Sequence, residues 1–190
     1  MSASHLTPAL QSWLRTHAAA LHESDAQGDA LLEQLGRAGL FGIAVPTALG
    51  GGGQVPHQAV QAIAEVAEHS LTAAFVLWAQ RAFIDYLCVS DNHAARERWL
   101  PGLLGGTLAG ATGLSNAMKF LSQLEPLQVQ EQSGEGGARQ VTGRMPWVTN
   151  LRRAGFVVAA AVQPAQAGAQ PIIVALESSS AGLRRSDDLD

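Results

Sequence analysis

The chain has 190 residues, a formal net charge of −4 and a hydrophobic fraction of 47%. This length suits one ordinary domain or two small ones, and the acidic balance excludes a broad basic surface for nucleic acid. The sequence has no run of about 18 apolar residues, the length needed to span a membrane, and its N-terminus lacks a signal-peptide pattern. The single cysteine, Cys88, excludes a disulfide framework. We therefore expect a cytoplasmic protein with no membrane span and no nucleic-acid partner.

The first part of the sequence predicts two helices. Thr7 and Pro8 form a typical helix start, and apolar residues then recur at helical spacing. A second helix should begin near Asp25 or Asp29 and stop at Gly39, because glycine tolerates the left-handed conformation that ends many helices.

Three further helices are predicted before the pattern changes. Residues 56–68 carry one apolar face, whereas residues 71–89 are apolar almost all round, which is typical of the central helix of a bundle. An amphipathic helix over residues 92–100 should end at Pro101 and Gly105–Gly106.

The second part of the sequence predicts strands, at residues 124–132, 140–147, 156–162 and 171–176. Gly134, Gly136 and Gly137 would form a hairpin turn between the first two strands. Helices followed by strands indicate an α+β fold with a boundary near residue 107. The predicted sheet ends in a polar segment without closing, so an edge and an apolar face would need a cover.

Residue types that carry out catalysis form no convincing set. The six histidines lack the spacing of metal ligands, and Cys88 lies in the most apolar predicted helix, where a structural role is expected. No carboxylate pair stands out as a general acid and base. We therefore expect no metal site and assign no catalytic residue.

Two segments carry more information. Residues 110–116 place hydroxyls and small residues where helices give way to strands, and residues 146–150 place Trp147 two residues before Thr149. Each segment is consistent with an ordinary turn or strand end. Each could equally give hydrogen-bond donors and a flat ring face to a planar heteroaromatic cofactor.

Four segments, in the same order along the chain, resemble the acyl-CoA dehydrogenase family. They are residues 35–46 (LGRAGLFGIAVP), 49–53 (LGGGG), 96–107 (RERWLPGLLGGT) and 147–150 (WVTN). The last is similar to the W-[VIS]-[TS]-N flavin loop of that family. The resemblance implies an N-terminal all-α helical bundle domain over residues 1–107. An incomplete, antiparallel, β-barrel-like part of the middle domain would follow over residues 108–190.

The same resemblance implies FAD as cofactor and an acyl-CoA thioester as substrate. Members of the family form the α,β-unsaturated product, with hydride transfer to flavin N5, and a homo-oligomer is expected for the full-length protein. The residues expected at the cofactor are Thr112, Gly113, Ser115, Trp147, Thr149 and Asn150.

Each of these positions has an implied role. Trp147 would cover a face of the isoalloxazine, and Thr149 would bond near N5. Thr112 and Gly113 would meet the pyrimidine edge, and Ser115 would approach the pyrophosphate. Such placement favours the reduced, anionic flavin, while the chemistry itself belongs to the cofactor.

The sequence departs from the family in two ways. Residues 112–116 read TGLSN where the family has T-E-P-x-x-G-S-D, so the hydroxyl arrives about three residues early. This departure is consistent with an alternative function, that of a flavin-dependent monooxygenase of the same fold. The catalytic base of the family lies in a C-terminal helical domain outside these residues, since family members are about twice as long. A non-catalytic, truncated fragment that binds a partner through its uncovered sheet is a third reading.

Overall fold

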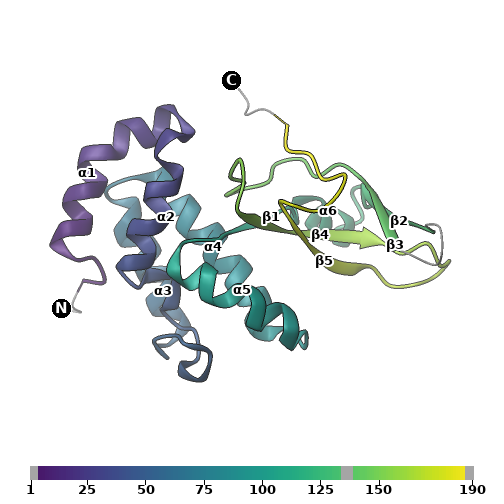
Figure 1. Cartoon of the computed structure of the whole chain (residues 1–190), viewed down its shortest axis with the longest axis horizontal. Helices are drawn as coiled ribbons and strands as arrows, with labels where there is room; N and C mark the ends of the chain where they lie inside the picture. The colour runs from purple at the N-terminus through teal and green to yellow at the C-terminus, as the bar shows by residue number, and fades with distance from the viewer. Residues whose placement is uncertain (1–3, 134–138, 187–190) are drawn as a thin grey trace. The chain divides into compact units, whose positions relative to one another are not determined.

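The computed structural model describes residues 4–133 and 139–186, and the chain divides into two compact units, Met1–Gly110 and Ala111–Asp190. The first unit is helical and the second is built on a sheet, so the expected α+β fold is confirmed (Figure 1). None of the helices in the described ranges has the length and hydropathy that crossing a membrane requires. The predicted hairpin turn at residues 134–137 lies outside the described residues.

The helices of the first unit are α1 (Pro8–Glu23), α2 (Gly28–Arg37), α3 (Pro56–Ala67), α4 (Leu71–Val89) and α5 (His93–Gly105). Three short 3-10 turns connect them, at Asp25–Gln27, Leu40–Gly42 and Thr47–Leu49. The Thr7 hydroxyl accepts the Leu10 N–H at 3.2 Å, so α1 begins at the predicted cap. Gly39, the predicted stop of the second helix, has a left-handed φ of 73° just after α2.

Helix α4 is the central helix of this unit, as its apolar composition predicted. It packs against α1, α2, α3 and α5. Leu77, Phe83 and Ile84 are at most 2% exposed, and burial of three such side chains contributes several kcal/mol, on the order of 1.5–3 each.

Helix α5 is longer than predicted. It continues through Pro101 to Gly105 instead of ending at Leu100. Proline removes only one hydrogen bond of the ladder, and the extra turn buries Leu103 completely. Gly106, with a φ of 73°, then ends the helix through N–H contacts to the carbonyls of Gly102 and Leu103.

A buried glutamine connects α4 with the end of this unit. The Gln80 side chain is fully buried, and its amide nitrogen donates to the carbonyls of Leu103 and Leu108 at 2.9 and 2.8 Å. Its amide oxygen accepts the Gly110 N–H at 2.7 Å. All of these groups are buried or partly buried, so the side chain satisfies backbone groups that would otherwise lose their water.

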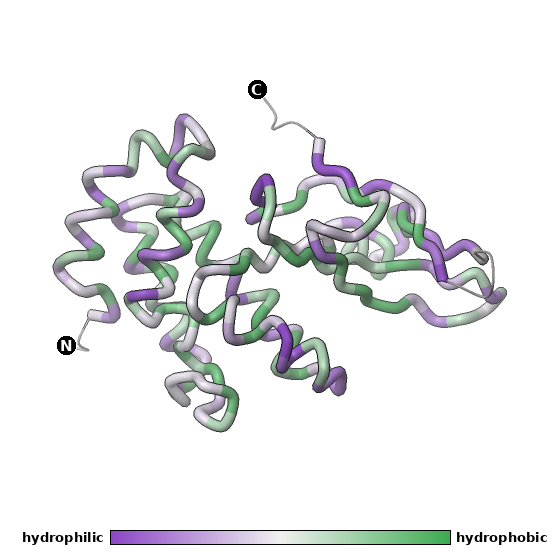
Figure 2. The backbone as a smooth tube through the Cα atoms, viewed as in Figure 1, coloured by the Kyte–Doolittle hydropathy of each residue, from purple (hydrophilic) through white to green (hydrophobic). Residues whose placement is uncertain are grey.

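The second unit contains a sheet, whose first strand begins just before the division at Gly110, and one short helix, α6 (Ser115–Leu121). The strands are β1 (Ala109–Thr112), β2 (Val129–Ser133), β3 (Arg139–Gly143), β4 (Phe156–Gln163) and β5 (Ile172–Glu177). They lie in the order β1-β4-β2-β3, and β5 also pairs with β4 (Figure 1). Each residue from Phe156 to Val162 is at most 7% exposed, and Figure 2 shows β4 as a continuous hydrophobic segment.

The sheet is mixed rather than wholly antiparallel, which corrects one expectation. The pairs β2–β3 and β4–β5 are antiparallel, but β2 and β4 run parallel, with Val129 opposite Val162. The chain between β2 and β4 forms β3 and a long loop. This connection is long enough for the crossover that a parallel pair of strands requires. Among the described residues the strands do not close into a barrel.

Candidate functional site

The two segments singled out in the sequence lie side by side in the second unit. Thr112 and Thr149 form an isolated antiparallel bridge. The Thr112 N–H donates to the Thr149 carbonyl at 3.3 Å, and the Thr149 N–H donates to the Thr112 carbonyl at 3.4 Å. Next to this bridge the Gly113 N–H donates to the Ala159 carbonyl of β4 at 2.9 Å. The end of β1 therefore positions the 146–150 loop.

A side-chain bond adds a second connection between the segments. The Ser115 hydroxyl, in the first turn of α6, donates to the Pro146 carbonyl at 3.1 Å across 31 residues of sequence. The proton of this hydroxyl is therefore used within the protein.

The 146–150 loop exposes a large aromatic side chain to solvent. The Trp147 side chain is 74% exposed, and its backbone φ is 59°. Asn150 is also left-handed, with a φ of 63°, but asparagine tolerates this region better than other residues. For tryptophan the conformation costs on the order of 1 kcal/mol or more, and such strain is concentrated at functional sites.

Gly113 has a packing reason to be glycine. A Cβ at this position would lie 2.9 Å from the Ala159 carbonyl oxygen and 3.0 Å from the Met145 sulfur. Any side chain would therefore push β1 away from β4 or displace Met145. The residue thus allows the chain after Thr112 to lie close to β4 and to Met145.

Asn116 is structural. Its side chain is only 6% exposed, and its amide nitrogen donates to the Glu125 carboxylate at 2.9 Å and to the Pro126 carbonyl at 3.0 Å. Its oxygen accepts the Gln128 N–H at 2.9 Å. The bond from Asn116, followed by the charge of Lys119, lowers the pKa of Glu125. The 112–116 segment thus divides into a part facing the loop and a part that supports the chain before β2.

Two donors of the loop remain available to a ligand. Neither the Thr149 hydroxyl nor the Trp147 indole N–H makes a hydrogen bond to another described residue. Together with the exposed ring, they are groups suited to a planar molecule that carries hydrogen-bond acceptors.

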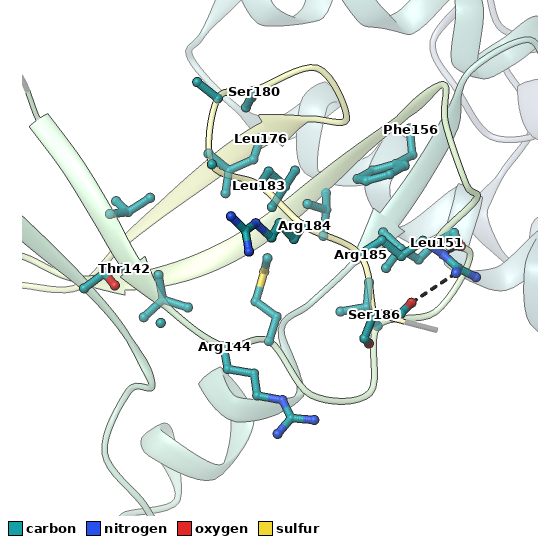
Figure 3. Close-up of a pocket in the computed structure, with 18 residues that line it drawn as sticks. Thr142, Arg144, Leu151, Phe156, Leu176, Ser180, Leu183, Arg184, Arg185 and Ser186 are labelled. Atoms are coloured by element: carbon teal, nitrogen blue, oxygen red, sulfur yellow. Dashed lines mark hydrogen bonds between the residues drawn. The ribbon is translucent and has the colours of Figure 1, made fainter. Parts of the chain in front are cut away.

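A cavity of about 690 Å³ lies against the sheet, beside the same loop (Figure 3). Its apolar lining includes Val129, Met145, Phe156 and Leu176, and its basic lining consists of Arg144, Arg184 and Arg185. None of the six residues expected at a cofactor lines it. The cavity and the Trp147 surface are thus distinct features of the second unit.

Other candidate chemistry receives no support from geometry. Within the described ranges, no group of three or more His, Cys, Asp or Glu residues could hold a metal ion. Burial, and then the charge of Asp85, raise the pKa of the Cys88 thiol, so this half-buried cysteine is not an activated nucleophile.

The left-handed Trp147 and the bond from Ser115 to Pro146 were not visible in the sequence. An asparagine such as Asn150 gives a weak signal for a left-handed residue, but a tryptophan gives none. The hydroxyl of Ser115 was singled out, although the acceptor found for it is a backbone carbonyl.

Comparison with known proteins identifies the relatives of this chain. A family model described as "Acyl-CoA dehydrogenase, N-terminal domain" matches residues 5–107. No curated protein sequence matches in a direct sequence search. A probable acyl-CoA dehydrogenase from Mycobacterium abscessus has a similar structure, with a TM-score of 0.74 and 23% identity over 98% of this chain and 53% of that chain.

Two further solved structures are similar. An acyl-CoA dehydrogenase from Bacillus anthracis, complexed with FAD, gives a TM-score of 0.74 and 18% identity, and the match covers all of this chain and 33% of that chain. Methanesulfinate monooxygenase from Pseudomonas fluorescens gives a TM-score of 0.69 and 17% identity over 93% of this chain and 44% of that chain. At these identities the similarity shows the fold alone.

The fold is that of the N-terminal and middle parts of acyl-CoA dehydrogenase structures. Because the family model matches residues 5–107 of 190, the chain belongs to the acyl-CoA dehydrogenase family. It spans about half, or less, of the solved structures that it matches.

Proposed function

We propose that the chain forms the flavin-binding front half of an FAD-dependent oxidoreductase that acts on an acyl-CoA thioester. The observation that carries this proposal is the bridge between Thr112 and Thr149. It joins the two segments that resemble the family's flavin contacts and leaves the Trp147 ring 74% exposed beside them.

The residues present fit a flavin. The Trp147 indole offers a flat apolar surface, and the Thr149 hydroxyl offers a donor that no described residue uses. The backbone N–H groups of Thr112 and Gly113 already bond to Thr149 and Ala159. We propose that Thr112 meets the pyrimidine edge, as the resemblance to the family implies, with Gly113 allowing the close approach. Asn150 would complete the loop at its far end.

FAD supplies the hydride acceptor for α,β-dehydrogenation when it is bound. This chain's residues would orient the ring and donate a hydrogen bond near the position that receives the hydride, which favours the reduced state. We assign no catalytic base to these residues. Assembly into a homo-oligomer and a cytoplasmic location are part of the same proposal for the complete enzyme.

Binding of FAD to the 190-residue chain tests the proposal without requiring turnover. The indole N–H signals of the four tryptophans can be followed by NMR during titration with FAD. We expect the Trp147 signal to shift and the signal of Trp78, an exposed tryptophan on α4, to stay in place. Millimolar FAD that leaves the Trp147 signal unchanged would overturn the proposal.

A matched pair of variants checks that the surface is specific. Trp147→Ala should weaken FAD binding at least about fivefold, since stacking on an indole is worth roughly 1 kcal/mol beyond burial. Trp78→Ala removes an indole that is 44% exposed and stacks on Phe75, and it should leave the affinity for FAD unchanged. Equal losses in both variants would contradict a site at Trp147.

A flavin-dependent monooxygenase is the second candidate. Two observations favour it: the 112–116 segment lacks the acid and proline of the dehydrogenase pattern, and a monooxygenase is among the similar structures. Oxygen consumption with reduced flavin, without oxidation of acyl-CoA, would support it. A chain that binds no flavin but pairs tightly with another protein would support the third reading, a non-catalytic fragment.

A further inference from the structure

We infer that Ser115 is a positioning residue that holds the Trp147 loop in its ligand-presenting conformation, and that it does not contact the cofactor directly. The inference rests on the proposed function in one respect, namely that this loop is the flavin surface. The contacts that carry it lie entirely within the second unit.

The first step is the register of the two segments. Ser115 lies three residues after Thr112, and Pro146 lies three residues before Thr149. A regular antiparallel ladder continued from the bridge would place residue 115 opposite residue 146, as a pair without backbone hydrogen bonds, so the hydroxyl bond follows the register that the bridge sets. The backbone has already turned into α6 at this point, so the Ser115 side chain makes the connection to the loop.

The second step is the peptide plane that the bond fixes. The Pro146 carbonyl and the Trp147 N–H share one planar peptide group, and rotation of that plane about the Trp147 N–Cα bond is the φ angle of Trp147. A donor at 3.1 Å from the Pro146 oxygen therefore restrains the rotation that sets the left-handed φ of 59°. The bridge of Thr149 to Thr112 restrains the loop from its other side.

The third step explains the unusual sequence. The TGLSN segment brings its hydroxyl about three residues earlier than the family pattern does. At this position the hydroxyl bonds to the backbone of the loop. Because its proton is donated to Pro146, Ser115 has no second proton to give to a phosphate.

Amide exchange in the absence of FAD tests this role directly. The Thr149 N–H belongs to the bridge, so its exchange rate reports opening of the loop. Ser115→Ala should speed its exchange about tenfold, which corresponds to loss of one hydrogen bond. Ser122→Ala, at the other end of α6, is the matched control and should change nothing. Ser115→Thr keeps the hydroxyl and should restore protection.

The amide exchange rates across the sheet distinguish a positioning role of Ser115 from a general stabilisation of the unit. Exchange of the amides that pair β4 with β5 should be the same in Ser115→Ala and in the unchanged protein. Faster exchange throughout the sheet would mean that Ser115 merely stabilises the unit and would overturn the inference. If Ser115→Ala does not fold, Ser115→Cys keeps a weaker donor and should give a smaller, local acceleration at Thr149. Unchanged exchange at Thr149 in Ser115→Cys would then overturn the inference.

FAD affinity provides the second readout. The apparent affinity for FAD is proportional to the closed fraction of the loop, so Ser115→Ala should weaken FAD binding by no more than it increases opening of the loop. Weaker binding with unchanged Thr149 exchange would show direct contact with the cofactor and overturn the inference. If no form of the chain binds FAD, the proposed function fails, whereas the exchange rates still decide whether Ser115 holds the loop.

Discussion

Glu65 shows how one side chain fixes the start of the chain. Its carboxylate accepts the Ser4 hydroxyl at 2.9 Å and the His5 N–H at 2.8 Å, and Gln61 donates to its other oxygen at 3.2 Å. Burial raises the pKa of Glu65, but the bonds from Ser4 and the His5 backbone, with the charge of His5, together lower it below its usual value. The charged form is therefore the one that the folded state favours.

The pKa of Glu65 leads to a pH-dependent stability. A carboxyl whose pKa is lower in the folded state stabilises the fold above its unfolded pKa, and this contribution is lost as the pH falls through the folded pKa. Glu65→Gln should lower the free energy of unfolding at pH 7 by up to about 1 kcal/mol, a value reduced by solvent screening. The difference should shrink below about pH 4.

Urea unfolding followed by circular dichroism at several pH values measures this effect. Glu68→Gln, at the exposed carboxylate just after α3, is the control and should be neutral. A loss of stability in Glu65→Gln that stayed the same from pH 7 to pH 3 would show that the charge is not involved.

At the scale of elements, two glycines allow α2 and α5 to approach closely. A Cβ at Gly36 in α2 would lie 2.5 Å from the Gly105 carbonyl oxygen. A Cβ at Gly106, just after α5, would lie 2.2 Å from the Leu32 carbonyl oxygen. Both contacts are with backbone atoms, which cannot rotate away as a side chain can, so the helix backbones touch at this crossing.

Gly36→Ala should therefore destabilise the helical unit even though alanine favours helices. The propensity gain of about 1 kcal/mol is smaller than the overpacking cost of roughly 1–3 kcal/mol, which backbone contact makes larger. We expect a net loss of about 1–2 kcal/mol in chemical unfolding. Gly28→Ala, in the same helix with nothing within 4 Å of the added Cβ, should be neutral or stabilising. Similar effects of the two variants would contradict close packing at Gly36.

The sequence predicted the bounds of a helix well where its apolar pattern and its capping residue indicate the same ends. Leu71–Val89 has the predicted bounds because the Ser70 hydroxyl caps α4 and apolar residues continue to its end. The extension of α5 past Pro101 was missed because its cause is tertiary, the burial of Leu103. Helix α6 and the parallel pairing of β2 with β4 likewise depend on contacts far apart in sequence.

The candidate site, like the fold, could be predicted from the sequence only in part. Resemblance to a family pointed to Thr112, Trp147 and Thr149, and the bridge places their segments together. The sequence could not show that Asn116 is a buried support. It also could not show that Trp147 is left-handed, since both features depend on neighbours distant in sequence.

At the scale of the whole molecule, the chain consists of two compact units, with the division after Gly110. The sequence predicted two domains, 1–107 and 108–190, and we propose that they unfold separately. One glycine from each unit allows a test. Gly36 touches the backbone of α5, and Gly143, with a φ of 146°, would place a Cβ 2.1 Å from the Gln128 carbonyl oxygen.

Separate unfolding predicts that each substitution acts only on its own unit. Gly36→Ala should speed amide exchange in α1 to α5 and leave β2 to β5 unchanged. Gly143→Ala should do the reverse, because its strained φ and the clash with Gln128 disrupt the pairing of β2 with β3. Exchange measured by mass spectrometry on peptides from both units distinguishes the cases. If either variant speeds exchange along the whole chain, the two units unfold as one cooperative body, and the proposal of separate domains is wrong.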